Sequence, residues 1–467
     1  MEDNESLAID HDSRLGKTKV GDEITQGTKW FRHAFCRGVA KEGLMWLLDR
    51  FLRKVVRTGR LIITDADGRV YDYGEAASAP IHLRFTDKRT ALHIARYPAL
   101  GAGEAYMRGW LVVEQPHDIR DLVLMIAAQA SHAGQGLEAR GRLRHWVDKA
   151  AWWVDQFNHR ARASKNVKHH YDLNRQFYEL FLDEDRQYTM AYFTDEKATL
   201  ERAQLDKKAL IAAKLRLPQD ARGMRVLDIG CGWGGLALYL NRHYGCEVLG
   251  ISLAPDQVAF ANERAAAAGV ADKVRFDLVD YRDLTDRFDR ITSVGMIEHV
   301  GARHFGEYFG HTFDLLADDG VMLTHTIGRT DGPGFTDAWT RKYIFPGGYI
   351  PALSELQTAI ERTGWQVGDI EILRYHYAHT LAEWYRRTTL HAQEITRLYD
   401  AELLRMWQFY LAGAEQGFRT GKLVNFHIQS VKRQDVLPMT RDYILTEAAR
   451  LGQQEMPPQW HLAPRVA

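Results

Sequence analysis

The chain has little cysteine. Its 467 residues include three, Cys36, Cys231 and Cys246. Cysteines so few and so far apart exclude a disulfide framework and a cysteine-based zinc cluster. We therefore expect a protein of the reducing cytoplasm that has no metal site.

Long hydrophobic runs are also lacking. No window approaches 18 consecutive apolar residues, so we expect no segment that spans a membrane. The chain begins MEDNESLAID, which has neither a basic stretch nor an apolar core, and we expect no secretory signal. Attachment to a membrane surface stays open.

Net charge is absent too, because 61 Lys and Arg residues balance 61 Asp and Glu residues. A chain without an overall positive field is not expected to bind nucleic acid. What the chain does have is 45% hydrophobic residues, which is enough for ordinary buried cores in two or three domains.

The most informative stretch is RVLDIGCGWGGLALYLNRHY, residues 225–244. An apolar run ends in glycines, and hydrophobic residues then resume at helical spacing from Leu236 to Leu240. This pattern predicts a strand, a tight turn and a helix. Glycines accept backbone angles closed to other residues and let a ligand lie against the main chain at the helix N-terminus. A nucleotide-like ligand is implied.

The turn reads Asp228-x-Gly230-x-Gly232-x-Gly234, whereas a dinucleotide-binding turn carries GxGxxG. The form D-x-G-x-G-x-G resembles the first motif of S-adenosylmethionine-dependent methyltransferases, in which the acidic residue faces the ammonium of the methionine part. The alternative is a glycine-rich turn that holds no ligand. The motif alone does not identify a methyl acceptor.

Composition and periodicity divide the chain into five regions. They are a polar mobile tail over 1–28, a small α+β domain over 29–136, a basic aromatic linker helix over 137–168, a catalytic domain over 169–435 and a C-terminal tail over 436–467. In the small domain we expect a helix over 44–56, a hairpin over 61–74, a strand over 81–87 and a helix over 121–130.

Basic and aromatic residues are interleaved in the linker. They are Arg140, Arg142, Arg144, Lys149, Arg160, Arg162, Lys165 and Lys168 with Trp146, Trp152, Trp153 and Phe157. Such a helix suits an anionic membrane surface, because cations meet lipid headgroups while indole rings lie at the interface. The alternative is a linker that packs its tryptophans on a neighbouring domain and leaves its charges in water.

Strands alternate with helices in the catalytic domain. The predicted strands cover 225–231, 246–253, 273–280, 288–296 and 320–327, and the helices between them include 256–268 and 303–316. The alternation predicts an α/β fold with a doubly wound, largely parallel sheet. Because ligands of such sheets bind at the carboxyl ends of the strands, this end of the sheet is the expected site.

Seven segments recur in the order known from one family. They are HHYDLNRQFYELFLDEDRQYTMAYF, VLDIGCGWGGLA, DYRDL, SVGMIEHVG, LTHTIG, KYIFPGGYIP and YAHTLAEWY. The chain resembles the cyclopropane-fatty-acyl-phospholipid synthases, and the mycolic acid cyclopropane synthases are close relatives of these. The likeness spans about 169–432 and implies a class I, Rossmann-like methyltransferase sheet. The preceding domain also resembles that of the bacterial synthases, which implies a role in lipid binding or assembly.

The resemblance implies S-adenosylmethionine as cofactor. The matching residues are Tyr171, Tyr188, Thr189, Asp228, Gly230, Cys231, Gly232, Trp233, Gly234, Ser252, Gln257, Asp280, Tyr281 and Arg282. Hydroxyl groups can hold the carboxylate of the methionine part, polar groups after the second strand can meet the ribose, and the end of the third strand can meet adenine. An ordinary helix-surface glutamine is the alternative for Gln257.

The resemblance also implies a bicarbonate ion in the active site. The matching positions are Glu298, His325, Tyr377, the backbone N–H of Ile327, and Met190. From the residues alone, Glu298 follows an apolar strand, where a carboxylate is unexpected unless it is paired or used. His325 can instead be a satisfied core histidine, and Tyr377 a core aromatic with a bonded hydroxyl.

Two positions depart from the family pattern. Ser-Cys is usual in the family where this chain has Thr189-Met190, and a second cysteine is usual at Ala414. A thiol nucleophile is therefore excluded at both positions, in agreement with a mechanism that forms no covalent enzyme intermediate. Met190 weakens a bicarbonate contact if the cysteine side chain makes it, and leaves it unchanged if only the backbone does.

The implied reaction transfers the methyl group of S-adenosylmethionine to the cis double bond of an unsaturated acyl chain in a membrane phospholipid. Bicarbonate acts as the base, and the products are a cyclopropane lipid and S-adenosylhomocysteine. Aromatic candidates for stabilising positive charge are Tyr343, Phe345, Trp384 and Tyr385. A related lipid C-methyltransferase with a methyl-branched or methylene product and a non-catalytic lipid-binding protein stay open. We expect peripheral association with the inner face of the membrane; a homodimer stays open.

Overall fold

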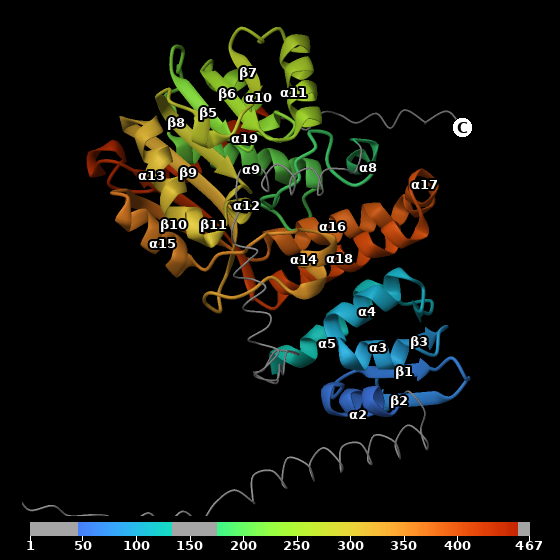
Figure 1. The fold of residues 1–467 in the computed structure, drawn as a ribbon. Coiled ribbons are helices and arrows are strands. Elements are labelled where there is room, and N and C mark those ends of the chain that lie inside the picture. The colour runs from blue at the N-terminus through green and yellow to red at the C-terminus, as the bar shows by residue number, and fades with distance from the viewer. Residues whose placement is uncertain (1–44, 133–174, 456–467) are drawn as a thin grey trace, which may run out of the picture.

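The structure is a computed structural model that describes residues 45–132 and 175–455. The predicted tail over 1–28, the linker over 137–168 and Tyr171 lie outside these residues. The described chain forms a small four-stranded domain and a large domain built on a seven-stranded sheet (Figure 1).

The small domain is of the α+β class, as predicted. Its elements are α2 (Trp46–Val55), β1 (Arg60–Thr64), β2 (Val70–Gly74), β3 (Pro80–Phe85), α3 (Thr90–Arg96), α4 (Pro98–Met107), β4 (Leu111–Val113) and α5 (Ile119–His132). The predicted hairpin is the antiparallel pair β1 and β2. Strand β1 alternates in burial, with Leu61 and Ile63 in the same core cluster as Leu48 and Leu52 of α2, so one face of the sheet is covered.

The large domain contains the remaining elements. Its strands are β5 (Arg225–Ile229), β6 (Glu247–Ser252), β7 (Val274–Leu278), β8 (Phe288–Val294), β9 (Leu316–Arg329), β10 (Gln366–Leu373) and β11 (Leu423–Val431). Its helices are α8 (Arg175–Glu179), α9 (Leu200–Leu215), α10 (Gly235–Tyr244), α11 (Pro255–Ala267), α12 (Ile297–Val300), α13 (Phe305–Leu315), α14 (Ala338–Tyr343), α15 (Leu353–Arg362), α16 (His376–Leu390), α17 (Ala392–Leu398), α18 (Ala401–Arg419) and α19 (Asp442–Gln454). Short 3₁₀ turns are η2 (Tyr281–Asp283), η3 (Ala302–His304) and η4 (Gln434–Val436).

The large sheet has the order β10-β11-β9-β8-β5-β6-β7. Neighbours from β9 to β7 are parallel, and β11 is antiparallel to both β9 and β10. The predicted doubly wound, largely parallel sheet is therefore confirmed. The five predicted strands correspond to β5 to β9, whereas β10 and β11 are additions that the sequence analysis does not contain.

Both faces of the sheet are buried. Val226 of β5 joins the core cluster that contains α9, α10 and α11, whereas its neighbour Leu227 joins the cluster on the opposite face with α13 and α15. Successive residues of a strand point to opposite faces, so a strand covered on both sides reads as a continuous apolar run. This burial explains why RVLDI was recognisable as a strand.

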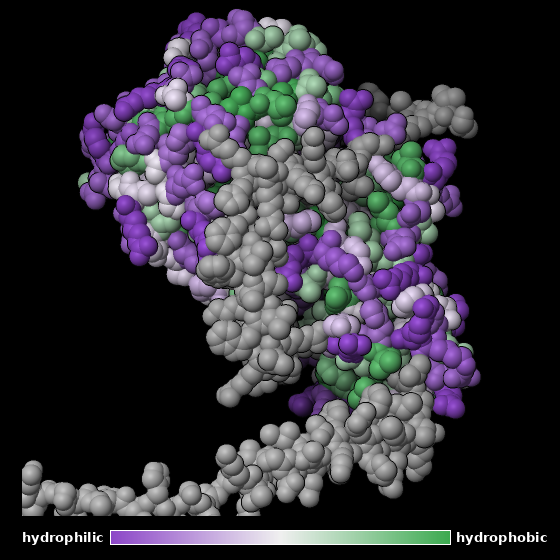
Figure 2. Space-filling view, in the orientation of Figure 1, coloured by the Kyte–Doolittle hydropathy of each residue, from purple (hydrophilic) through white to green (hydrophobic). Residues whose placement is uncertain are grey.

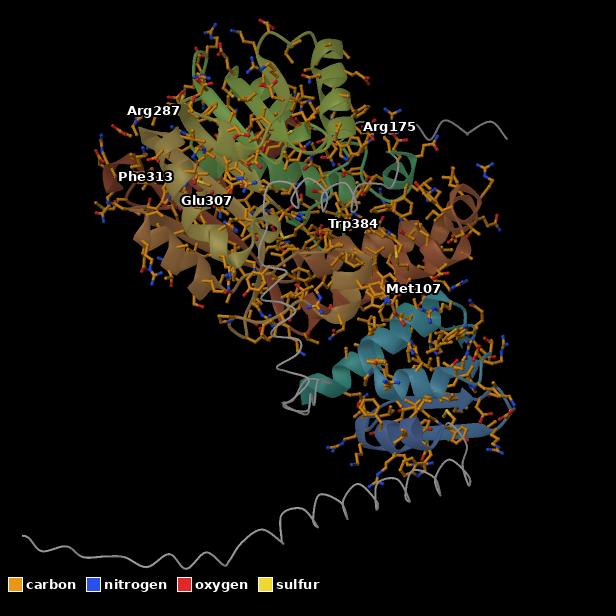
Figure 3. The ribbon with its side chains drawn as sticks, in the orientation of Figure 1. Met107, Arg175, Arg287, Glu307, Phe313 and Trp384 are labelled. Atoms are coloured by element: carbon orange, nitrogen blue, oxygen red, sulfur yellow. The ribbon has the colours of Figure 1, made fainter. Side chains whose placement is uncertain are left out.

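The small domain packs against the helical layer that ends the large domain. Helices α14, α16 and α18 lie between the large sheet and the small domain (Figure 1). The Arg120 side chain of α5 donates two hydrogen bonds of 2.6 Å to the buried carboxylate of Glu415 on α18. Figure 3 labels Met107 at this boundary and Trp384 within the helical layer. One hydrophobic cluster runs from the small domain into α16 and α18, so the two domains share a core.

The segment that we assigned to a C-terminal tail from residue 436 contains helix α19. This helix packs on α9, and Leu451 is fully buried. Figure 2 shows mainly hydrophilic residues on the visible face, interrupted by separate hydrophobic areas. Within 45–132 and 175–455, no helix is long and apolar enough to cross a membrane.

Candidate active site

One cavity of about 250 Å³ lies at the carboxyl ends of the parallel strands. It brings together most of the predicted site residues. Those that line it are Tyr188, Thr189, Asp228, Gly230, Cys231, Gly232, Trp233, Ser252, Gln257, Asp280, Tyr281, Arg282, Glu298, His325, Ile327 and Tyr377. Residues from segments almost 200 positions apart in the chain therefore share one pocket.

Three predicted site residues are not in that lining. Tyr171 lies outside the described residues. Gly234 lies one position beyond the lining glycines, as the N-cap of α10. Met190 is fully buried in the hydrophobic core cluster shared by the two domains, so its side chain is not part of the cavity wall.

The glycine turn has the backbone geometry expected of it. Gly230, Gly232 and Gly234 have φ angles of 80°, 52° and 82°, which favour glycine. The N–H groups of Gly230 and Cys231 both donate to the carbonyl of Ile251 on β6, at 2.9 and 3.1 Å. These bonds tie the turn to the neighbouring strand and leave its main chain open to the cavity, at the N-terminus of α10.

Asp228 is a buried carboxylate at the end of β5. Its side chain is 1% exposed, and within the described residues its Oδ2 atom has no hydrogen-bond partner. Burial raises the pKa of Asp228 from 3.8 to about 7. An unpartnered carboxylate in a cavity wall favours a ligand that brings a positive charge. The ammonium of S-adenosylmethionine fits this requirement, and the open glycine turn beside Asp228 fits a ligand that lies against the backbone.

Lys207 of α9 supports this wall from behind, and sequence reasoning missed it. Lys207 is 1% exposed. Its ammonium donates hydrogen bonds to Gln187 Oε1 at 2.6 Å and to Thr189 Oγ1 at 2.8 Å. Burial lowers the pKa of Lys207, and the negative charge of Asp183 opposes that change. No sequence pattern identifies Lys207, because α9 is buried on nearly all sides and its polar residues do not gather on one face.

The second and third strands end in polar groups, as the sequence analysis expected. Ser252 accepts a hydrogen bond from the backbone N–H of Ala254 at 3.2 Å, and its Oγ lies 3.4 Å from Gln257 Oε1. Gln257 is 6% exposed, so the helix-surface interpretation of this residue is not supported. Arg282 donates two hydrogen bonds to the Asp280 carboxylate, at 2.9 and 2.6 Å. This pair fixes the loop after β7 against the cavity.

Glu298 lies on α12, the short helix that follows β8. Its Oε1 atom accepts a 2.6 Å hydrogen bond from the backbone N–H of Ile327 on β9. Within the described residues its Oε2 atom has no partner, and burial raises the pKa of Glu298 to about 7. The N–H that the resemblance assigns to bicarbonate is therefore engaged by Glu298 in this structure. A carboxyl group with a pKa near neutrality can donate a proton to an anion or accept one.

His325 lies on β9 and is 1% exposed. Burial lowers its pKa to about 3, so the imidazole is neutral. The side-chain nitrogen Nδ2 of Asn425 lies 3.1 Å from its Nε2 atom, and His427 Nε2 lies 2.8 Å from its Nδ1 atom. Sequence reasoning named neither partner, although Asn425, His427 and Gln429 recur at every second position of a strand whose other residues, apart from Ser430, are apolar.

Aromatic residues close the side of the cavity nearest the helical layer. Phe345, Tyr377 and Tyr410 line it, whereas the candidates Tyr343, Trp384 and Tyr385 do not. The hydroxyl groups of Tyr343 and Tyr385 instead donate to Glu104 and Asp118 of the small domain, at 2.8 and 2.9 Å. Trp384 is stacked on Tyr188 with ring centroids 5.2 Å apart. It supports a lining residue from behind.

His299 is a further lining residue that the sequence analysis did not include as a candidate. Burial lowers its pKa to about 4, so its ring is neutral within the cavity wall. Within the described residues, no group of three or more His, Cys, Asp or Glu side chains can hold a metal ion. The buried carboxyl groups of Asp228 and Glu298 form an arrangement suited to an organic cation and to proton transfer.

The chain is similar to known enzymes that methylate lipids. The chain is 38% identical over 288 residues to a probable fatty acid methyltransferase of Pseudomonas putida, covering 59% of this chain and 72% of that one. It is 34% identical over 342 residues to the cyclopropane-fatty-acyl-phospholipid synthase of Escherichia coli K12, covering 73% and 85%. A solved structure of the mycolic acid cyclopropane synthase CmaA1 complexed with SAH and CTAB has 30% identity and a TM-score of 0.54, covering 57% of this chain and 97% of that one.

A family model extends this similarity to the residues of the cavity. The model of the mycolic acid cyclopropane synthetases matches residues 158–428, which include every strand of the large sheet from β5 to β10 and most of β11. The glycine turn, the buried Asp228 and the pair Glu298 and His325 all fall within the match. The chain is an S-adenosylmethionine-dependent methyltransferase and belongs to the mycolic acid cyclopropane synthetase family.

Proposed function

We propose that this enzyme transfers a methyl group from S-adenosylmethionine to the cis double bond of an unsaturated acyl chain in a membrane phospholipid, and that the product is a cyclopropane lipid. The observation that carries the proposal is the single cavity that joins a cradle for an organic cation to the buried pair Glu298 and His325. A double bond is a weak nucleophile, and S-adenosylmethionine supplies an electrophilic methyl group on a sulfonium.

The residues on the cofactor side do binding and orientation. Asp228 would hold the ammonium of the methionine part, because it lines the cavity and, within the described residues, its Oδ2 atom has no hydrogen-bond partner. Ser252 and Gln257 would meet the ribose. The loop fixed by the pair of Asp280 and Arg282 would meet adenine.

The residues on the other side suit a small anion that removes a proton. We propose bicarbonate for this role, and it would supply the base. Glu298 carries a carboxyl group with a pKa of about 7, whose protonated form can donate to an anion. The rings of Phe345, Tyr377 and Tyr410 present apolar surface to the acyl chain and a negative face to developing positive charge.

Access to an acyl chain requires contact with a bilayer surface. We propose that the enzyme is cytoplasmic and binds peripherally to the inner face of the membrane, without binding nucleic acid. The basic and aromatic residues of the sequence between Arg140 and Lys168 support this proposal. Sedimentation with vesicles tests it: protein should accompany anionic phospholipid vesicles and be released as the salt concentration rises.

A related C-methyltransferase with a methyl-branched or methylene product is the second candidate. The similarity to a probable fatty acid methyltransferase favours it, and so does Met190, which stands where the family usually has cysteine. The two reactions share the methyl transfer and differ in which proton is removed afterwards. The product therefore decides between them.

The test uses the purified full chain with S-adenosylmethionine, bicarbonate and vesicles of an unsaturated phospholipid. S-adenosylhomocysteine measures turnover, and proton NMR of the extracted lipid identifies the product. High-field ring protons are expected. Vinyl or branched-methyl signals would assign the second candidate, and no turnover on unsaturated lipids would contradict catalysis altogether. A parallel reaction in bicarbonate-free buffer should be slower if bicarbonate is the base.

A further inference from the structure

The strongest feature outside the predicted site is a second buried histidine behind the first. His427 of β11 stands directly opposite His325 of β9 in the antiparallel register, and Asn425 stands opposite Ile327. Side chains two positions apart on a strand point to the same face, so Asn425 and His427 both flank the His325 ring. The result is a row of three polar side chains in an otherwise apolar part of the sheet.

One end of this row of side chains lies at the cavity and the other end lies behind it. His325 and Asn425 line the cavity, but His427 does not. Asn425 touches the Nε2 edge of the His325 ring, and His427 touches its Nδ1 edge. The Nε2 edge is thus the one next to the cavity, and the Nδ1 edge faces away from it.

The ring nitrogen that carries the proton in each histidine follows from the hydrogen-bond partners of the ring nitrogens. Both rings are buried, and burial lowers the pKa of His325 to about 3 and that of His427 well below its usual range, so each ring carries one proton. Within the described residues, Nδ1 of His427 has no hydrogen-bond partner. A buried N–H without an acceptor is rarer and less favourable than a buried lone pair without a donor. The proton of His427 therefore belongs on Nε2.

The remaining proton is then determined. A hydrogen bond between two neutral rings needs one donor and one acceptor, so Nε2–H of His427 donates to Nδ1 of His325. The proton of His325 is left on Nε2, at the edge next to the cavity. The structure places Nδ2 of Asn425 against this edge and, within the described residues, leaves Oδ1 of Asn425 without a partner. A half-turn of the amide exchanges the two atoms in the same space, so that Oδ1 accepts the proton while no ligand is bound.

We propose that His427 is a positioning residue that holds His325 in the tautomer with its proton on Nε2, so that His325 presents a hydrogen-bond donor to the cavity. The assignment deepens the proposed function and rests on it for its chemical meaning. An anion in the cavity can replace or share the contact that this proton makes with Asn425, because both side chains line the cavity. A donor at this point holds an anion and does not remove a proton from carbon. His325 therefore orients the base, and the anion itself takes the proton.

The experiment is NMR of the full chain labelled with ¹⁵N in histidine, in the absence of substrate. Long-range correlations distinguish protonated from unprotonated ring nitrogens, and the single variants His325→Gln and His427→Phe assign the two sets of signals. Both rings are expected as single tautomers with the proton on Nε2. A proton on Nδ1 of His325 in the unaltered protein would overturn the proposal, whether or not any variant folds.

Two substitutions of His427 distinguish its role as a hydrogen-bond donor from a role in packing alone. His427→Phe keeps a ring but removes the donor, so we expect mixed tautomers of His325 and turnover lowered by ~10-fold or more, with unchanged affinity for S-adenosylmethionine. His427→Gln restores an N–H donor and should recover the single tautomer and most of the turnover. Equal loss in both variants, or a His325 signal that does not change in His427→Phe, would show that residue 427 acts only by packing.

A control variant tests whether replacing any histidine by phenylalanine has the same effect. His243→Phe replaces a histidine at the end of α10, outside the cavity lining, and should leave both the His325 signals and turnover unchanged. The spectra need no turnover. An unaltered protein that has the expected tautomers but modifies no lipid would contradict the proposed function and leave the role of His427 intact.

Discussion

At the scale of single residues, the site is organised by carboxyl groups that the fold buries without full pairing. Asp228 and Glu298 each have one oxygen without a partner within the described residues, and burial raises the pKa of both to about 7. Such groups lower the stability of the empty protein and gain partners when ligands bind. Both were predicted as candidates, Asp228 from the D-x-G-x-G-x-G pattern and Glu298 because a carboxylate is unexpected directly after an apolar strand.

The substitution Asp228→Asn tests whether this buried carboxylate lowers stability and strengthens cofactor binding. The pKa of Asp228 is raised above its unfolded value of 3.8, so the folded protein binds this proton more tightly than the unfolded chain. Stability is therefore lost as pH rises from about 4 to about 7. We expect the free energy of unfolding of the variant to exceed that of the parent by about 1–3 kcal/mol at pH 8 and by less at pH 5. The variant should bind S-adenosylmethionine ~30-fold or more weakly.

Unfolding by denaturant at the two pH values and calorimetric titration of S-adenosylmethionine measure these effects. Asp272→Asn, which removes a carboxylate from the exposed end of the loop before β7, is the matched control. A stability difference between Asp228→Asn and the parent that does not grow with pH would contradict the raised pKa.

Glu298 is expected to act on turnover and not on cofactor binding. In Glu298→Gln the side-chain oxygen can still accept from the N–H of Ile327, but the group no longer titrates. We predict turnover about 100-fold lower and an unchanged affinity for S-adenosylmethionine, as befits a group that exchanges or directs a proton. The exposed Glu361→Gln on α15 serves as control. Weaker cofactor binding with normal turnover at saturation would move Glu298 to the cofactor side.

At the scale of elements, the parallel part of the sheet was predictable and its edge was not. The strands β5 and β6 are mainly apolar and bounded by turn residues, and they were recognisable in the sequence because both of their faces are covered. Strand β10 is half-exposed and reads QVGDIEIL, whereas β11 has polar residues at every second position from Asn425 to Gln429 although it is buried. The polar residues of β11 obscure its place in the sheet: Asn425 lines the cavity, His427 contacts His325, and Gln429 donates hydrogen bonds to Lys214 and Tyr443.

The turn between β5 and α10 gives a prediction at this scale. A Cβ atom on Gly234 would lie 2.7 Å from the Phe276 ring and 2.8 Å from the Ala261 side chain, at a φ of +82°. Gly269 has a similar φ of +70° but nothing within 4 Å. Gly234→Ala should therefore cost about 2–5 kcal/mol, from strain and overpacking, and Gly269→Ala about 1–2 kcal/mol from strain alone. Chemical denaturation compares them; equal losses would show that contact with α11 and β7 is unimportant.

At the scale of the whole molecule, the small domain is joined to the cavity through α14. Glu104 of α4 is 4% exposed and accepts hydrogen bonds from Lys342 at 2.7 Å and from Tyr343 at 2.8 Å, both on α14. Burial opposes ionisation of Glu104, but its donors outweigh that effect and lower its pKa to about 2. Thr340 of the same helix and Phe345 just beyond it line the cavity. No sequence pattern links residue 104 to residue 342, so this connection was not predictable.

The arrangement predicts that Glu104→Gln impairs the use of lipid and spares the cofactor. Loss of the carboxylate weakens both bonds to α14, and the cavity wall near Phe345 becomes less well positioned. We expect the apparent KM for phospholipid vesicles to rise roughly 10-fold, with an unchanged Kd for S-adenosylmethionine, because neither Lys342 nor Tyr343 is among the residues proposed to hold the cofactor. Glu114→Gln is the matched control, since Glu114 pairs with Arg84 on the small domain at 44% side-chain exposure. If both variants raise KM alike, the effect belongs to the charge of the small domain and not to its hold on α14.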